Sequence, residues 1–238
     1  MTIAVTGFLI AVYILMEYGI VAKDTMSGAY YGSNEAKLIQ LYQEGDEMKF
    51  NLEYFGNEAF KRSLLRLGEK AGWSKSNEIP SNCFIDNLAV LALDVCRPDL
   101  KRQLKIEFMR SFNELVNDFK YAEFTDDEIG VSDSFIAGEK KKDVKFSIKQ
   151  DKNVEWNIIK PRFKIEIKDF RLITDVWDKI DSCNLKSNIN LIDCLKGYGF
   201  KIVTRDFGKY LFVTIDTGKK FFYKGEIKTL EVNFAVEK

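Results

Sequence analysis

Residues 200–236 read FKIVTRDFGKYLFVTIDTGKKFFYKGEIKTLEVNFAV, and they decide the fold class of this chain. Apolar and polar residues alternate along most of the stretch, which is the period of a strand with one buried face. The segments DFGK and DTGK each place a glycine where a hairpin turn needs a positive φ angle. The stretch therefore predicts four antiparallel strands that follow one another as a meander.

Three further strands are predicted upstream, in the segments DVKFSIKQ (143–150), NVEWNII (153–159) and RFKIEIKDF (162–170). Residues 174–196 interrupt the strand period with helical spacing. Together these patterns predict an α+β protein. Its C-terminal part is a mainly antiparallel β-sheet or half-open barrel with a helical insert.

Helical spacing dominates the region before the strands. It predicts a short helix over 35–44 with its apolar residues on one side, a second over 57–71, and a third over 84–95. A fourth begins near Asp99, and its apolar stripe predicts a buried face. The stripe comprises Leu100, Leu104, Phe108, Phe112, Leu115, Val116 and Phe119.

The N-terminal segment is the longest apolar run, and residues 2–22 contain a single charge, Glu17. A helix of this length spans about 31 Å, which matches a bilayer core of roughly 30 Å. A cleaved signal peptide is the first alternative, but no basic residue precedes the run. A buried strand and helix of a soluble fold is the second, although a dinucleotide-binding opening would need more glycines than Gly7 alone. The run predicts a single-pass membrane anchor.

These observations divide the chain into four parts. They are an anchor at 1–23, a mainly helical region at 24–124, a linker at 125–142 and a β-rich α+β domain at 143–238. The linker contains TDDEIGVSDS, an acidic stretch that is poor in apolar residues and typical of a solvated loop.

Charge is divided unequally although 36 basic and 36 acidic residues cancel. Residues 1–139 carry a net charge of −8, and residues 140–238 carry +8. This division is typical either of a basic face for an anionic partner or of two halves that attract each other. The basic half indicates anionic lipid or nucleic acid as a partner class. Its candidate interaction residues are Lys209, Tyr210, Lys219, Lys220 and Tyr223.

The chain has no histidine, which excludes histidine-based triads, histidine metal ligands and imidazole pH switches. None of the four cysteines forms a CxxC pair. On one continuous helix Cys183 and Cys194 would lie about 16 Å apart, too far for a disulfide, whereas a bend between them would bring them together. We expect four buried free thiols. Those thiols, and Lys23 and Lys37 after the apolar run, favour a cytoplasmic location for the large domain.

One fragment indicates chemistry. Glu166 and Lys168 on a predicted strand resemble the metal-binding strand of restriction-like nucleases, with Asp151 or Asp143 as the second carboxylate. Alternating charges on the wet face of a strand also explain the pattern. No cofactor motif is present.

The sequence therefore predicts a single-pass, membrane-anchored subunit of an envelope or membrane-associated complex that acts through protein contacts. The bilayer contacts residues 2–22 in this interpretation. The alternatives are a membrane-tethered effector or metal-dependent enzyme built on Glu166 and Lys168, and a domain that senses anionic lipid or another ligand.

Overall fold

The computed structural model describes residues 31–74, 80, 83–85, 88–89, 96–118, 123–150, 153–184 and 191–237. Within these ranges no helix combines the length and the apolarity needed to cross a membrane. The predicted anchor, residues 1–23, lies outside them. The described chain is α+β with antiparallel strand pairing, as predicted.

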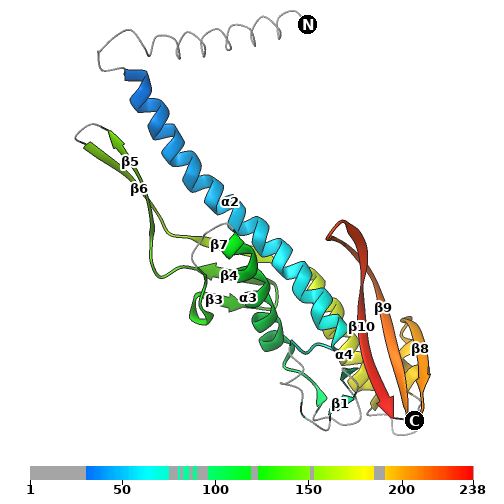
Figure 1. The fold of residues 1–238 in the computed structure, drawn as a ribbon. Coiled ribbons are helices and arrows are strands. Elements are labelled where there is room, and N and C mark those ends of the chain that lie inside the picture. Colours follow the sequence, from blue (N-terminus) through cyan, green and yellow to red (C-terminus); the bar gives the residue numbers. More distant parts are fainter. Residues whose placement is uncertain are drawn as a thin grey trace, which may run out of the picture.

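Helix α2 (Tyr31–Glu69) is the longest described helix, and α3, the β5–β6 hairpin, β7, β9 and β10 contact it (Figure 1). Its 39 residues give a length of about 58 Å. The prediction of separate helices over 35–44 and 57–71 was wrong because apolar residues continue the buried face across the intervening segment. Met48, Leu52 and Phe55 are each at most 3% exposed.

Helix α3 (Leu100–Asp118) packs along the C-terminal half of α2. Five residues of its predicted apolar stripe are buried and Leu115 is partly buried, whereas Phe119 lies outside the described residues. Between the two helices, the fully buried carboxylate of Glu107 accepts a hydrogen bond from Arg66 at 2.9 Å and pairs with Arg110. Burial acts to lower the pKa of Arg66, but the hydrogen bond and charge of Glu107 outweigh it and raise the pKa. This ion network ties α3 to α2.

A three-stranded sheet with strand order β3-β4-β7 packs against both α2 and α3. Its strands are β3 (Ile129–Val131), β4 (Phe135–Glu139) and β7 (Arg162–Glu166). The prediction of a solvated loop over TDDEIGVSDS was wrong, because η5 (Asp126–Glu128) and β3 occupy this segment. The Glu128 side chain accepts hydrogen bonds from the backbone of Thr125 and Lys141 and from Lys140, so the acidic run pins the start of β3 to the end of β4.

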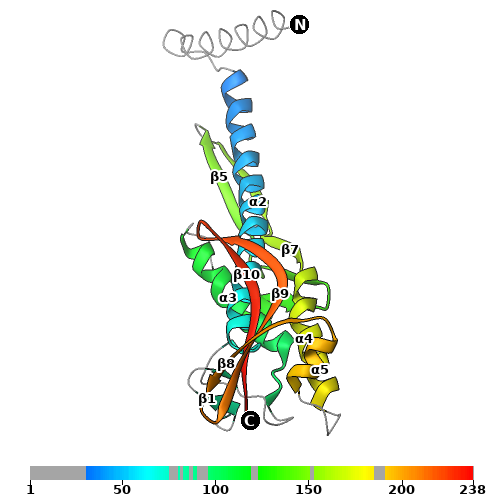
Figure 2. The same ribbon diagram turned by 90° about the vertical axis from the view of Figure 1, so that its right-hand side faces the viewer.

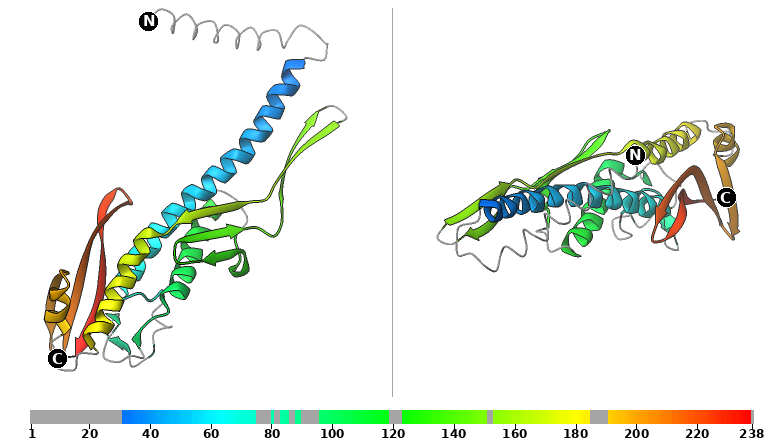
Figure 3. Two further views of the ribbon diagram at one scale, coloured as in Figure 1. Left: turned by 180° about the vertical axis from the view of Figure 1, so that it is seen from behind. Right: turned by 90° about the horizontal axis from the view of Figure 1, so that it is seen from above.

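Strands β5 (Val144–Gln150) and β6 (Asn153–Ile159) form a separate antiparallel hairpin, close to the predicted bounds. The hairpin extends beside the N-terminal half of α2 (Figures 1 and 3). Gly56 allows close approach of the first sheet to α2, since a Cβ there would lie 3.1 Å from Ile165.

The helical insert follows η6 (Lys168–Phe170) and consists of α4 (Arg171–Asn184) and α5 (Leu191–Gly197). Helix α4 buries Val176, Trp177 and Ile180 on one side. The Trp177 indole donates a hydrogen bond of 3.2 Å to the carbonyl of Ala71, just after α2 ends. The insert therefore closes the core at the C-terminal end of α2.

The last sheet has strand order β10-β9-β8 and lies across the C-terminal half of α2 (Figure 2). Its strands are β8 (Lys201–Phe207), β9 (Tyr210–Tyr223) and β10 (Glu226–Glu237). The predicted turn at Gly208 is present, with φ +61. The predicted turn at DTGK was wrong. Gly218 has φ +74 but lies inside β9, at a bulge where residues 217–219 oppose only Leu230.

The described strands thus form four separate sheets, and the expectation of one sheet or a half-open barrel was wrong. The fourth sheet is a pair of two-residue strands, β1 (Phe84–Ile85) and β2 (Leu88–Ala89), where the sequence predicted a helix over 84–95.

Candidate functional site

The predicted catalytic residues form an exposed ion pair. Glu166 ends β7, Lys168 opens η6, and their Oε2 and Nζ atoms lie 2.6 Å apart with side chains 71% and 83% exposed. The hydrogen bond and charge of Lys168 lower the pKa of Glu166, and those of Glu166 raise the pKa of Lys168. Both groups are thus held in their charged forms, which is the opposite of what proton transfer near neutral pH needs.

The third candidate, Asp151, lies outside the described residues. Among the residues that the structure describes, no group of three or more carboxylates or cysteines could hold a metal ion. A nuclease role for Glu166 and Lys168 stays a prediction.

An open hollow of about 540 Å³ surrounds this ion pair. It is lined by Asp133, Ser134, Phe135, Lys164, Glu166, Lys168 and Arg171. The Lys164 ammonium lies 4.3 Å from the centre of the Phe135 ring. The hollow has one more cation than anion, but its charged side chains are exposed to solvent. Such a surface attracts anions without selecting one.

The predicted interaction residues are split between the two ends of β9. Lys209 and Tyr210 lie at the β8–β9 turn. Lys220 and Tyr223 lie near the β9–β10 turn, about 33 and 43 Å from Tyr210 for an extended strand. Lys219 is paired with Asp169 at 2.9 Å. The structure therefore does not bring these residues together as one surface.

The structure reveals a surface that the sequence patterns missed, which we call the α2 ridge. Five large apolar side chains that are more than a third exposed lie on the outward side of α2 between residues 38 and 54. They are Leu38 (39%), Ile39 (58%), Tyr42 (58%), Phe50 (69%) and Tyr54 (55%). The buried residues of the same segment occupy the opposite side of the helix. The apolar side predicted for residues 35–44 faces outward, and Leu41 is the large apolar residue of that segment that is buried.

A second exposed apolar surface lies at the end of the β9–β10 hairpin, and we call it the hairpin tip (residues 220–228). Phe222 and Ile227 are direct cross-strand partners and are 67% and 72% exposed. Lys224 and Gly225 form the turn with φ values of +52 and +82, as a type I′ turn requires. On the opposite face of the hairpin, the guanidinium carbon of Arg62 from α2 lies over the Tyr223 ring, 5.7 Å from the ring centre. The hairpin tip is thus anchored to α2 and presents its apolar pair outward.

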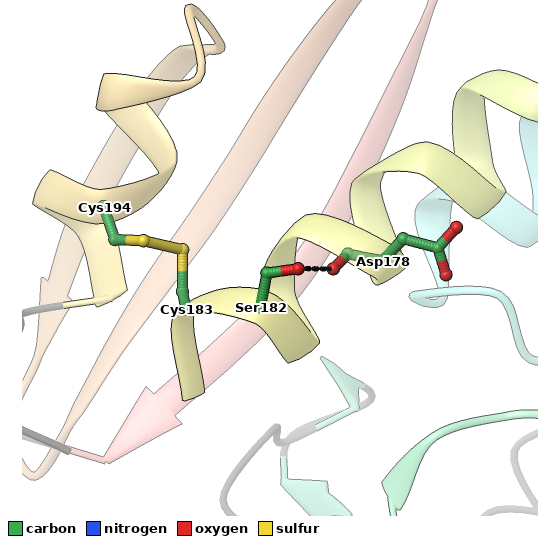
Figure 4. Close-up of a disulfide and its surroundings, with 4 residues drawn as sticks. All are labelled: Asp178, Ser182, Cys183 and Cys194. Carbon is green, nitrogen blue, oxygen red and sulfur yellow. Dashed lines mark hydrogen bonds between the residues drawn. A yellow bond between two sulfur atoms is a disulfide. The ribbon is translucent and has the colours of Figure 1, made fainter. Parts of the chain in front are cut away.

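All four cysteines are paired, so the expectation of free thiols was wrong. Cys83 bonds to Cys96, and Cys183 bonds to Cys194, with Cα atoms 5.3 and 5.9 Å apart. In the second bridge, Cys183 lies at the end of α4 and Cys194 lies in α5, so the bond joins two different helices (Figure 4). The chain therefore bends between Cys183 and Cys194, which is the alternative to one continuous helix that their spacing allowed.

No protein-family model, curated protein or solved structure matches this chain. Its function is therefore argued from its own residues.

Proposed function

We propose that this protein is a single-pass, membrane-anchored subunit of an envelope or membrane-associated complex and that it acts through protein contacts. The α2 ridge is the observation that carries the proposal. Single exposed apolar side chains are common on protein surfaces, but contiguous exposed apolar patches mark interaction sites. Here five such side chains lie along about four and a half turns of one helix, in two groups with the exposed Asp46–Lys49 ion pair between them.

Energetics support a contact at the α2 ridge. Full burial of a large apolar side chain contributes about 1.5–3 kcal/mol. The five ridge side chains are between 39% and 69% exposed, so burial of their exposed parts contributes roughly 4–8 kcal/mol before the cost of association. The ridge also lies on the part of α2 that follows the apolar segment at 2–22 most closely in the chain. A partner subunit in the same membrane would meet it there.

The two disulfides support an oxidising location for the domain, outside the cytoplasm. Unpaired cysteines were part of the reason to favour the cytoplasm, and that reason no longer applies. We therefore propose that the domain lies on the outer side of the membrane that residues 2–22 span.

Photo-crosslinking in native membranes tests this proposal. A photoreactive residue is placed at Ile39 or Phe50 on the α2 ridge, and in a control at Gln40, which is exposed on another side of α2. We expect the two ridge positions to give the same discrete adduct and the control to give none. Equal labelling at all three positions, or no adduct at any, would contradict the proposed contact.

Membrane attachment and location need their own measurement. The full chain should stay in the membrane pellet after extraction with alkaline carbonate. A protease added to intact cells should degrade the domain. Release of the protein by carbonate would contradict the membrane anchor. Protection of the domain from the protease would contradict its proposed location outside the cytoplasm.

A further inference from the structure

We infer that the α2 ridge of one copy binds the hairpin tip of a second copy, so that the protein assembles head to tail. This inference rests on the proposed function and names the partner of the same ridge. Both surfaces belong to the described residues, and their charges, their exposed apolar groups and their positions favour pairing.

The charges of the two surfaces are complementary. Residues 42–54 of the ridge segment carry four carboxylates and one lysine, and all five charged side chains are exposed. The hairpin tip carries Lys220, Lys224 and Lys228 against a single acid, Glu226. None of these three lysines has an ion-pair partner within the part of the chain that the structure describes. Like surfaces would repel, so two ridges or two tips would not pair.

The apolar groups of the two surfaces also match. Successive strand residues point to opposite faces, so Phe222 and its cross-strand partner Ile227 point away from Tyr223 and from α2 of their own copy. Phe50 and Tyr54 offer aromatic rings of similar size on the ridge.

Lys220, two residues before Phe222, points to the same face of the hairpin, and Lys224 lies in the turn at the edge of that face. Lys228 pairs with Phe221 across the strands and lies over the Tyr223 ring on the other face. Lys220 and Lys224 thus supply the basic rim of the tip, which complements the acidic rim of the ridge.

Position decides between contact within one copy and contact between two. The hairpin tip is held at Arg62 through Tyr223, and Tyr54 lies eight residues earlier on α2, about 12 Å along the helix axis. The exposed pair of the tip also faces away from its own helix. The tip can instead reach the ridge of a neighbouring copy. That copy has the same orientation and is shifted by about 12 Å along the axis of α2, or tilted by a similar amount.

The contact joins two different surfaces of each chain. Every copy then has one ridge and one tip to offer, and such a heterologous contact builds rings or open chains of copies. In this assembly the acidic N-terminal half of one copy attracts the basic C-terminal half of the next copy.

Charge reversal of each surface tests this inference with the full chain in detergent micelles. One variant carries Lys220→Glu and Lys224→Glu on the tip, because both lysines are exposed beside the Phe222 and Ile227 pair. Another carries Glu47→Lys and Glu53→Lys on the ridge. A control carries Lys142→Glu and Lys201→Glu, which changes the net charge equally at exposed positions elsewhere. Circular dichroism and thermal unfolding verify that all variants remain folded.

Mass in solution is measured by light scattering after size-exclusion chromatography at low and high salt. We expect the wild type and the control to self-associate, and each reversed variant alone to associate at least tenfold more weakly. A mixture of the two reversed variants should associate again, because the acidic tip meets the basic ridge. High salt should weaken every one of these assemblies.

A monomeric wild type, or reversed variants that associate as well as the wild type, would overturn the inference. Failure of the mixture to recover would do the same, since it would show that the two surfaces do not meet. If the photo-crosslinks from the ridge lead to a different protein while the wild type is monomeric, the proposed function stands and this inference fails.

Discussion

Loss of the two disulfides should destabilise the protein by an amount that follows from the loops they close. Cys83 and Cys96 are 13 positions apart, and Cys183 and Cys194 are 11 positions apart. The chain-entropy relation assigns about 3 kcal/mol to a loop of either length. In a domain of this size a loss of 1 kcal/mol lowers the melting temperature by about 2–4 °C, so each bridge contributes about 6–12 °C.

The assay is thermal unfolding of the full chain in detergent, followed by circular dichroism with and without a reductant. The variants are Cys83→Ala with Cys96→Ala, and Cys183→Ala with Cys194→Ala. Each should retain about half of the wild-type response to reductant, because one bridge remains. Thiol titration of the untreated protein from its native compartment should detect no free thiol.

Two results would refute this reasoning. One is a reductant-induced shift below about 2 °C in wild-type protein whose thiols have all become reactive, since the bridges would then not constrain the unfolded chain. The other is four reactive thiols in the untreated native protein. That second result would also remove the support for an oxidising location.

Three further predictions concern the core. Glu107→Gln should cost about 3 kcal/mol in urea unfolding, because the buried Arg66–Glu107 pair loses its anion, and a cost below 1 kcal/mol would argue against the network. Gly68→Ala should also cost about 3 kcal/mol, because its Cβ would lie 2.1 Å from the carbonyl oxygen of Glu231, and any gain in stability would show that helix propensity prevails instead. Hydrogen bonds from Lys141, Thr125 and Lys140 outweigh the effect of burial and lower the pKa of Glu128 from 4.5 to about 2. The folded pKa of Glu128 lies below its unfolded pKa, so its charged form stabilises the fold. In urea unfolding, the wild type should be more stable than Glu128→Gln by the full amount above pH 4.5, and this difference in stability should be lost as pH falls through about 2. A difference that does not change with pH would contradict this.

Much of the secondary structure was predictable because local periodicity decides it. The stripe of α3 was read from its spacing, and residues such as Leu104 and Phe112 are fully buried. Strands β5, β6 and β7 follow the period of two that their sequences show. The turn at Gly208 was predictable because a positive φ at one residue is a local property.

Errors arose where a local pattern has two physical explanations. Gly218 has the positive φ that its sequence indicated, but a bulge within β9 uses that conformation as well as a turn does. The hydrophobic spacing of residues 84–95 suited a helix, whereas the described residues of that segment pair as two short strands. Spacing alone does not distinguish these pairs of outcomes.

The candidate site was less predictable than the fold. The sequence indicated Glu166 and Lys168 through a charge pattern, and the structure places them together as an exposed pair on a wet surface. The α2 ridge escaped because an apolar residue on a helix is usually expected to face the core. A clear signal was nevertheless present, since apolar residues occupy more than one side of α2 between residues 38 and 55.

The sequence by itself determined the α+β class, the antiparallel pairing, the buried face of α3 and the opposite charges of the two halves, because periodicity and composition are local quantities. Only the tertiary structure decided that α2 is one helix, that the four cysteines form two disulfides, one of them between α4 and α5, and which apolar residues stay exposed. Those outcomes depend on which segments distant in sequence pack together. Burial is a property of such contacts, and no single segment contains them.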